Sequence, residues 1–203
     1  MQFYIIGNGE SRRGIDLTAL RAPTLGCNAL YRDFTPSLLV SVDNKMNIEI
    51  EKAKYSAPRA YRDVKLLAQQ KRQKKKAPAS ITVTPWHPYF PSGAALTNLG
   101  WCSGTTAAWI ACEHITDTTI LTMVGFDMND TSGKVNNIYK GTNCYQHPKA
   151  VDYSPWVEQW KRLFDMYPAI RFNFIGNYNI SDVFGRAYKN ADVTPLEQFK
   201  REL

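Results

Sequence analysis

The sequence predicts an α/β fold: a single Rossmann-like domain over residues 1–203, with a mostly parallel sheet of about six strands flanked by helices. Two observations support this prediction. Short apolar runs that end at Gly, Asn or Asp alternate along the chain with segments of helical periodicity. A length of 203 residues with 44% hydrophobic residues suits one domain with a sizeable core and leaves little room for a second.

The expected strands are short and apolar, and most of them end at a residue that favours turns. They cover residues 3–6, 23–27, 37–42, 79–84, 120–124 and 170–175. The expected helices carry apolar residues three or four positions apart. They cover residues 44–54, 62–70, 103–114, 154–167 and 194–203, the last with Pro195 in its first turn.

Small and polar residues follow each of the first three strands. They are Gly7, Asn8, Gly9 and Ser11 after the first strand, Asn28 after the second and Asp43 after the third. The carboxyl ends of parallel strands meet at one edge of a sheet, where open α/β proteins bind ligands. Each residue alone is better explained as an ordinary turn residue. Together, at three successive strand ends, they favour one site where glycines let backbone N–H groups approach an anion.

The dinucleotide fingerprint is incomplete in this loop. Arg12 stands where the third glycine is required, and Gly14 comes two positions too late. The second strand should end at an acidic residue that binds a ribose hydroxyl, but Asn28 holds this place and Asp33 lies beyond the strand. A nicotinamide dehydrogenase is therefore not expected. The sequence also contains no Walker-type phosphate loop.

The chain is basic, with a formal charge of +7 and a pI near 9.2. Such a surface attracts a nucleotide-sugar donor, an anionic glycan or nucleic acid equally well. The charge is concentrated in an expected basic helix and loop over residues 61–78, which contains Lys74, Lys75 and Lys76. Because lysines suit the C-terminus of a helix, a solvated helix end is the simpler explanation. As candidate acceptor-binding residues, they would instead contact a polyanion such as DNA.

Residues 85–101 contain three prolines, two glycines and four aromatic residues. Prolines at this density exclude a regular helix or a central strand, so we expect a long ordered loop. Its aromatic side chains either pack the loop onto the core or stack on a sugar or base. Trp86 and His87 are candidate acceptor-binding residues, and His87 is also a second-rank candidate for acid or base catalysis.

The second half of the chain adds candidates at the same sheet edge. Ser103 is expected to cap the helix that begins there, and Gly104 allows close packing; both are candidate donor-binding residues. Asp127 follows the strand over residues 120–124 and so falls at the carboxyl edge. The polar segment 128–152 is too long for a simple connection, which suggests a lid or binding loop.

The four cysteines are widely spaced, with no Cys-x-x-Cys pair and no histidine at metal-ligand spacing. We expect free thiols in a reducing compartment and no structural zinc site. No apolar run reaches the length of a membrane span, and the N-terminus leads into a strand without a signal sequence. The expected location is the cytoplasm.

Three segments are similar to motifs of one known group of proteins. IIGNGES, with Ile15-Asp16 after it, is similar to a GNGPS-like loop followed by Ile-Asp, although Glu10 replaces the usual Pro. GCNALY is similar to CN-x-x-Y at the end of a second strand. SGTTAAWIACEHITDTTILTMVGFD is similar to a small-residue helix before a strand that ends in Gly-x-Asp. In this order the motifs resemble the sialyltransferase-like group: bacterial glycosyltransferase family 42 sialyltransferases and the related archaeal hydroxymethylpterin diphosphokinases.

The resemblance implies a metal-independent glycosyltransferase that uses a nucleotide-activated sugar and no other cofactor. His147 is the positional match for the general base, and Asp127 is the second catalytic candidate. The candidate donor-binding residues are Gly7, Asn8, Gly9, Ser11, Asn28, Asp43, Ser103, Gly104, Tyr139 and Tyr145. The acceptor would be the hydroxyl of a glycan or of a modified nucleic-acid base.

Two other classes of function remain open. The diphosphokinase relatives point to pyrophosphoryl transfer, which requires Mg²⁺ and clustered carboxylates; Glu10, Asp43 and Asp127 are the candidates to supply them. The third class is a non-catalytic module that binds a nucleotide or nucleic acid. No Asp-x-Asp pair indicates a metal for the leading hypothesis.

Overall fold

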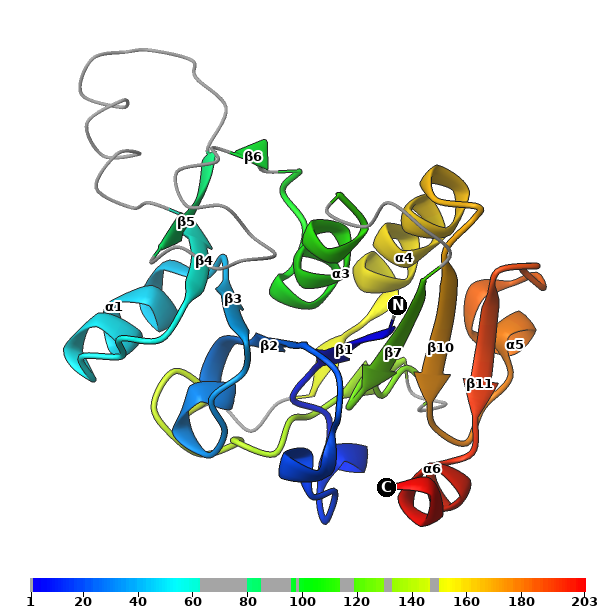
Figure 1. Ribbon diagram of the computed structural model, residues 1–203, viewed down its shortest axis with the longest axis horizontal. Coiled ribbons are helices and arrows are strands. Elements are labelled where there is room, and N and C mark those ends of the chain that lie inside the picture. Colours follow the sequence, from blue (N-terminus) through cyan, green and yellow to red (C-terminus); the bar gives the residue numbers. More distant parts are fainter. Residues whose placement is uncertain are drawn as a thin grey trace.

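A central sheet with helices on both faces forms the body of the protein (Figure 1). The computed structural model describes residues 2–62, 80–84, 96–97, 99–113, 119–129, 133–146 and 150–203. Within these ranges the main sheet has nine strands in the order β11-β10-β7-β1-β2-β3-β4-β5-β6. The strands from β11 to β4 are parallel, and β5 and β6 are antiparallel additions at one edge. The predicted α/β class with a mostly parallel sheet is confirmed.

The bounds of the elements are as follows. The main sheet contains β1 (Gln2–Ile6), β2 (Thr24–Cys27), β3 (Leu38–Ser41), β4 (Arg59–Arg62), β5 (Ser80–Thr84), β6 (Leu96–Thr97), β7 (Ile120–Val124), β10 (Arg171–Ile175) and β11 (Ala191–Thr194). A small separate sheet contains β8 (Lys134–Val135) and β9 (Val151–Asp152). The α-helices are α1 (Asn44–Lys52), α3 (Ser103–Glu113), α4 (Ser154–Met166), α5 (Ile180–Phe184) and α6 (Leu196–Glu202). The 3-10 helices are η1 (Glu10–Arg12), η2 (Leu17–Ala19) and η3 (Asn28–Arg32).

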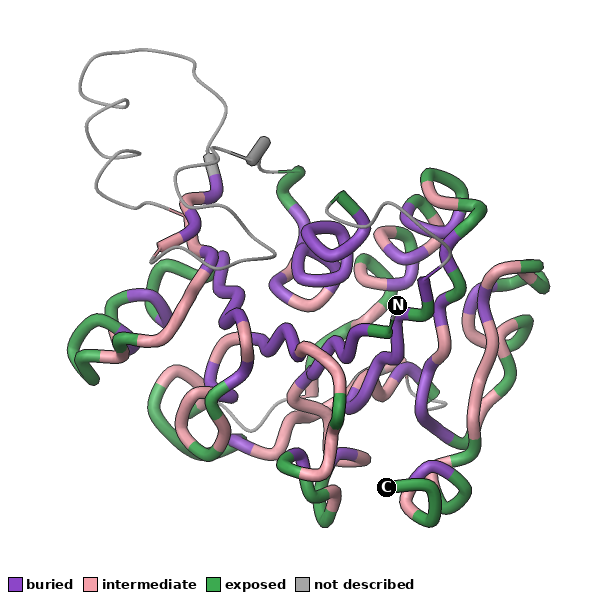
Figure 2. Tube along the Cα trace, in the orientation of Figure 1, coloured by how far each residue is buried: buried purple, intermediate pink, exposed green. Residues whose placement is uncertain are grey.

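Alternation along β1 divides the apolar residues between two cores. Phe3 and Ile5 pack with residues of α3, α4 and α5 on one face of the sheet. Tyr4 and Ile6 pack with residues of α1, η3 and α6 on the other face. The central strands are therefore buried on both sides, as the continuous purple of their trace shows (Figure 2). This burial explains why their sequences are apolar throughout.

All six expected strands are present, and the sheet is larger than the expected six. The additional strands are β4, β6 and β11. The expected helix over residues 62–70 does not begin at Arg62, because Arg62 is the last residue of β4 and pairs with Ile81 of β5. Residues 63–79 lie outside the part of the chain that the structure describes.

The strand order creates a switch point beside β1. After β1 the chain adds β2, β3 and β4 on one side and then returns to add β7, β10 and β11 on the other. The loops that follow β1 and β7 therefore leave neighbouring parallel strands toward opposite sides. Open α/β sheets bind ligands in the crevice that such a divergence leaves at the carboxyl edge.

The segment expected to form a lid is joined to the loop after β1. Asn137 forms an antiparallel bridge with Gly9, and the Ile138 N–H donates to the Asn8 carbonyl over 2.9 Å. The strand β8, which precedes Asn137, pairs with β9 near the C-terminal end of the segment. Residues 133–146 thus lie along the carboxyl edge of the sheet, beside the switch point.

Candidate functional site

A cleft of about 590 Å³ lies at the carboxyl edge of the sheet, at the switch point. Its lining comes from the loops after β1, β2, β3 and β7, the first turn of α3, the start of α4, residues 135–137, Tyr145 and Val151. The predicted site residues in this lining are Gly7, Asn8, Gly9, Asn28, Asp43, Ser103, Gly104, Asp127 and Tyr145. Residues far apart in the sequence are therefore brought together where the strand ends were expected to converge.

The loops after β1 and β7 cross in close contact. The Gly7 N–H donates to the Val124 carbonyl over 2.8 Å, and the Gly9 N–H donates to the Gly125 carbonyl over 2.9 Å. A Cβ atom on Gly7 would collide with the Gly125 carbonyl oxygen, and one on Gly9 would lie 2.6 Å from the Asp127 carboxylate. The glycines are thus required for the crossing. Their N–H groups bond within the protein, so they are not free to hold an anion as expected.

Ser11 and Asp127 connect the same two loops through side chains. The Ser11 N–H donates to Asp127 Oδ2 over 3.0 Å, and the Ser11 hydroxyl donates to Asp127 Oδ1 in a short hydrogen bond. Asp127 is half-buried and lines the cleft, whereas Ser11 lies behind it. Each carboxylate oxygen keeps a second lone pair with which it can accept a ligand hydroxyl.

Asn28 is held in one orientation by a chain of hydrogen bonds. The Val42 N–H donates to Ser103 Oγ over 3.1 Å, and the Ser103 hydroxyl donates to Asn28 Oδ1, 2.8 Å away. Asn28 has φ of 50°, a conformation that asparagine tolerates better than most residues. Because Oδ1 is occupied by Ser103, the amide presents its N–H₂ group on the other side.

The Asn28 amide faces Tyr145. Burial raises the pKa of Tyr145, the Asp43 charge raises it further, and a hydrogen bond from Asn28 opposes these effects only in part. The phenol therefore stays protonated at neutral pH. Because the phenol oxygen faces the Asn28 N–H₂ group, the Tyr145 O–H points away from that amide and can donate to another acceptor.

Asn8 contributes a second fixed amide. Its Nδ2 donates to the Cys27 carbonyl over 2.9 Å, which identifies the nitrogen and hence places Oδ1 on the opposite side. Oδ1 is buried without a hydrogen-bond partner among the residues that the structure describes. A buried amide oxygen in this state is costly, and a ligand that donates a hydrogen bond there would remove the cost.

The first turn of α3 faces the cleft through Ser103 and Gly104. The unpaired N–H groups and the dipole of a helix N-terminus attract negative charge. A Cβ atom on Gly104 would lie 2.6 Å from the Phe126 ring, so glycine lets α3 approach the loop after β7. The dipole of α3 therefore brings partial positive charge to this side of the cleft.

Tryptophans form the apolar side of the cleft. Trp101 and Trp160 are buried and belong to the core, whereas Trp156 of α4 is only half-buried and presents its remaining surface to the cleft. The sequence alone assigned the aromatic stripe of α4 to the core. That stripe contains Trp156 with Trp160, Leu163 and Phe164, so the sequence placed Trp156 in the core and missed its contact with the cleft. Trp156 lies at the start of the helix, next to Pro155.

Charged groups of both signs reach the cleft. Asp43 is exposed and makes no capping hydrogen bond to α1, although it occupies the N-cap position. Arg62, at the end of β4, donates to Asn44 over 3.3 Å and was not predicted as a site residue. Its assignment to β4 rather than to a helix is what brings it to the carboxyl edge.

Some predicted site residues lie elsewhere. Tyr139 is buried outside the cleft lining; its hydroxyl donates to Asp33 and accepts from Arg12 Nη2 at 2.9 Å. Glu10 bonds to Arg13 over 2.9 Å, with Lys140 3.4 Å away. The remaining candidates lie outside the described residues; they are Lys74, Lys75, Lys76, Trp86, His87 and His147.

Burial disfavours the thiolate form of the cysteines at the cleft. Cys27 and Cys102 both contribute to the lining, and burial raises the pKa of each above its usual value. All four cysteines are free, as the sequence predicted. Among the described residues there is no group of three or more His, Cys, Asp or Glu side chains placed to hold a metal ion.

Neither the family models, nor the curated proteins, nor the solved structures contain a match to the chain. Within the described ranges, no helix combines the length and apolar character needed to cross a bilayer.

Proposed function

We propose that the protein is a glycosyltransferase that moves a sugar from a nucleotide-activated donor to a hydroxyl acceptor. The observation that supports this proposal is the gathering of nine predicted donor-site and catalytic residues, from separate loops, in one cleft at the switch point of the sheet. The residues whose motifs resemble the sialyltransferase-like group include Asn8, Asn28 and Asp127, and all three line this cleft.

The cleft offers hydrogen-bond donors to a departing nucleotide phosphate. As the bond from the sugar to the phosphate breaks, negative charge grows on the leaving phosphate oxygen. The N-terminus of α3 and the Tyr145 hydroxyl can stabilise that charge, because both are oriented before the reaction begins. Asn28 acts on the same charge indirectly, by directing the Tyr145 proton toward the ligand.

The other side of the cleft suits the remainder of the donor. The half-buried indole of Trp156 provides an apolar surface for a base or sugar ring. The exposed Asp43 carboxylate, free of a capping role, can accept a hydrogen bond from a ribose or sugar hydroxyl. Asn8 Oδ1 can accept another.

The acceptor hydroxyl must lose its proton as it attacks the sugar carbon, and an imidazole with an ordinary pKa suits this step. We assign this role to His147, with His87 as the alternative. His147→Ala should lower turnover by roughly 10²- to 10⁴-fold while donor affinity stays nearly unchanged. Loss of turnover in His87→Ala alone would move the base to that residue, and loss in neither would contradict catalysis by histidine.

The first experiment is a thermal-shift screen of CMP-, UDP- and GDP-activated sugars, each with Mg²⁺ or with EDTA. A donor present at 100 times its Kd should stabilise the protein by about 2.7 kcal/mol. Transfer to a panel of hydroxyl acceptors is then followed by mass spectrometry of the product. If none of the nucleotide sugars changes the melting temperature, the proposal is contradicted.

A second candidate function is Mg²⁺-dependent pyrophosphoryl transfer, which the presence of Asp43 and Asp127 in one cleft favours. Glu10 does not join them, because it bonds to Arg13. The EDTA arm of the screen separates the two functions. Binding of a nucleoside triphosphate that requires Mg²⁺, without binding of any nucleotide sugar, would support pyrophosphoryl transfer.

A further inference from the structure

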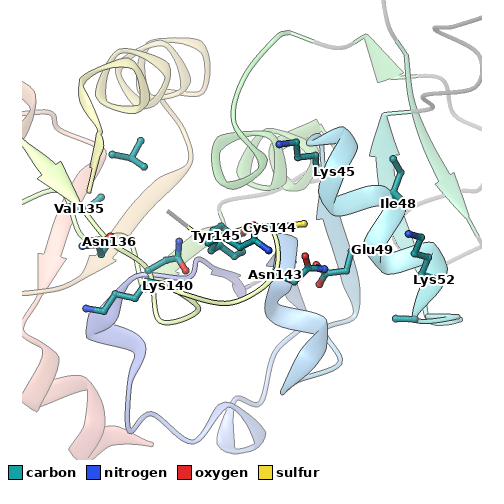
Figure 3. A pocket seen from close by; sticks show the side chains of 14 residues that line it. Lys45, Ile48, Glu49, Lys52, Val135, Asn136, Lys140, Asn143, Cys144 and Tyr145 are labelled. Atoms are coloured by element: carbon teal, nitrogen blue, oxygen red, sulfur yellow. The ribbon is translucent and has the colours of Figure 1, made fainter. Parts of the chain in front are cut away.

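A second hollow, of about 800 Å³, adjoins the cleft. It lies between α1 on one side and the segment 135–146 on the other, as Figure 3 shows. The residues common to both linings are Val135, Asn136, Asn137, Tyr145 and Val151. The hollow, which we call the α1 groove, therefore opens beside the Tyr145 hydroxyl rather than forming an independent cavity.

Lysines surround the α1 groove. Lys45 and Lys52 are exposed on one face of α1, two turns and about 10 Å apart along the helix axis. Lys140 lies across the groove, and its side chain is 51% exposed beside Glu10. Figure 3 shows the first two on α1 and the third on the facing segment. An anion in the groove would thus meet positive charge from both walls.

The carboxylate in the lining does not cancel this charge. Glu49 is the acidic residue among the described lining residues, and its side chain is only 13% exposed. It accepts hydrogen bonds from Arg32 at 2.5 and 3.0 Å, from Tyr31 at 2.7 Å and from Asn143 at 2.8 Å. Arg32 offsets Glu49, and Arg13 offsets Glu10, the ion-pair partner of Lys140, so the lysines determine the sign of the potential.

The remaining lining is rich in amides and poor in aromatic surface. The amide side chains belong to Asn136, Asn137, Asn143 and Gln146. Tyr145 is the aromatic residue of the lining within the described ranges, and its ring already stacks on Tyr139 at 6.3 Å. Single-stranded nucleic acids are held by aromatic rings on which successive bases stack, whereas amides bond well to hydroxyl groups. The chemistry of the lining therefore favours a sugar chain over nucleic acid.

We propose that the α1 groove binds the acceptor and that this acceptor is an acidic glycan, whose carboxylates contact Lys45, Lys52 and Lys140. The role of this glycan as an acceptor rests on the proposed glycosyl transfer. Binding of the acidic glycan in the groove does not depend on that proposal. A chain lying in the groove would deliver one hydroxyl group to the cleft beside Tyr145.

The test is calorimetry with the full chain at low ionic strength and without donor. The probes are a hexasaccharide of galacturonic acid, the same hexasaccharide with its carboxyl groups reduced, and a single-stranded DNA hexanucleotide. We expect the acidic hexasaccharide to bind about tenfold more tightly than the reduced one, and added salt to weaken its binding. Equal affinity for both hexasaccharides would overturn the proposal, and tighter binding of the hexanucleotide would replace the glycan by nucleic acid.

Lysine variants test whether the acidic hexasaccharide binds in the α1 groove. The double variant Lys45→Gln, Lys52→Gln should lower the affinity for the acidic hexasaccharide roughly three- to tenfold and leave the affinity for the reduced hexasaccharide unchanged. Lys189→Gln with Lys200→Gln removes the same charge far from the groove and should have no such effect. Lys140→Gln tests the opposite wall separately. Wild-type affinity in both groove variants would exclude the groove as the site.

The outcomes separate this inference from the proposed function. Nucleotide-sugar binding is measured in the thermal-shift screen, independently of the groove. Donor binding with no preference for the acidic hexasaccharide would refute only the groove assignment. Lysine-dependent glycan binding without any donor binding would refute only the transferase.

Discussion

The Ser103 hydroxyl donates to Asn28 Oδ1 over 2.8 Å and joins residues 75 positions apart in the chain. An amide oxygen can only accept, so Ser103 supplies the hydrogen of this bond, and its oxygen also accepts from the Val42 N–H. With Oδ1 toward Ser103, Asn28 turns its N–H₂ group toward Tyr145. These two contacts set the orientation of the Asn28 amide in the cleft.

Asn28→Asp should reverse the polarity of the contact with Tyr145. A carboxylate accepts from Ser103 as before, but it has no N–H for Tyr145, so the phenol would donate to Asp rather than to a ligand. We expect nucleotide-sugar affinity to fall at least tenfold, or about 1.4 kcal/mol. Calorimetry measures it, with Asn179→Asp as the control, because Asn179 is the N-cap residue of α5 and lies away from the cleft. Unchanged affinity in Asn28→Asp would refute the role of Tyr145 as a donor.

Trp156→Ala should weaken donor binding without unfolding the protein. Its indole is half-buried and faces the cleft, so truncation removes a stacking surface worth about 1–3 kcal/mol for a base. Trp160→Ala is the contrasting variant, because Trp160 is 1% exposed and packs against Phe126, Phe164 and Phe174. It should cost about 3–5 kcal/mol of unfolding free energy in urea titrations. A stable Trp156→Ala protein with full donor affinity would exclude stacking on Trp156.

Gly7→Ala should destabilise the crossing of the β1 and β7 loops. The added methyl would meet the Gly125 carbonyl, and backbone on both sides leaves it little room to move. We expect a loss of about 1–3 kcal/mol in unfolding free energy and a larger loss of donor affinity. Gly185→Ala is the matched control, since its φ of 75° carries the usual strain but nothing lies within 4 Å of the added methyl. Equal losses of donor affinity in the two variants would contradict this role for the crossing.

Glu49→Gln should make stability less dependent on pH. Burial acts to raise the pKa of Glu49, but hydrogen bonds from Tyr31 and Arg32 outweigh it and lower the pKa below its usual value of 4.5. A lowered pKa stabilises the folded state fully above pH 4.5, and this contribution is lost as the pH falls through the folded pKa. At pH 7 the variant should lose about 1–3 kcal/mol, because Arg32 is left without its partner.

The measurement is urea unfolding of both proteins at pH 7 and at pH 3. The difference in unfolding free energy should shrink at the lower pH. Glu158→Gln serves as the control, because the Glu158 side chain is 65% exposed and its contact with Lys161 contributes little. A difference as large at pH 3 as at pH 7 would show that Glu49 acts through shape rather than charge.

The fold was predictable because its main strands are buried on both faces. Each of β1, β2, β3 and β7 is a short apolar run, and such runs carry their signal within a few residues. The convergence of Asn8, Asn28 and Asp127 followed from the same reasoning, since parallel neighbours place their carboxyl ends together. Local sequence and one topological rule were enough for this part of the site.

The rest depended on contacts that no local pattern encodes. The strand β4 reads Arg-Ala-Tyr-Arg, with apolar burial complete only at Ala60, and its pairing with β3 and β5 decides its structure. Tyr139 was predicted to bind the donor, yet Arg12 and Asp33 hold its hydroxyl outside the cleft. The Gly7 and Gly9 N–H groups were expected to bind an anion, but carbonyls of the β7 end accept them. Backbone or side-chain partners from distant segments decided each case.

The central place of β1 has a consequence for synthesis of the chain. This strand is made first, yet one of its two neighbours is β7, whose Ile120–Val124 leave the ribosome much later. Until then, β1 presents an apolar edge with unpaired backbone groups, and such edges recruit strands from other chains. A nascent chain that pauses before Ile120 should therefore depend on chaperones, whereas one that has released Val124 can cover this edge of β1 with β7.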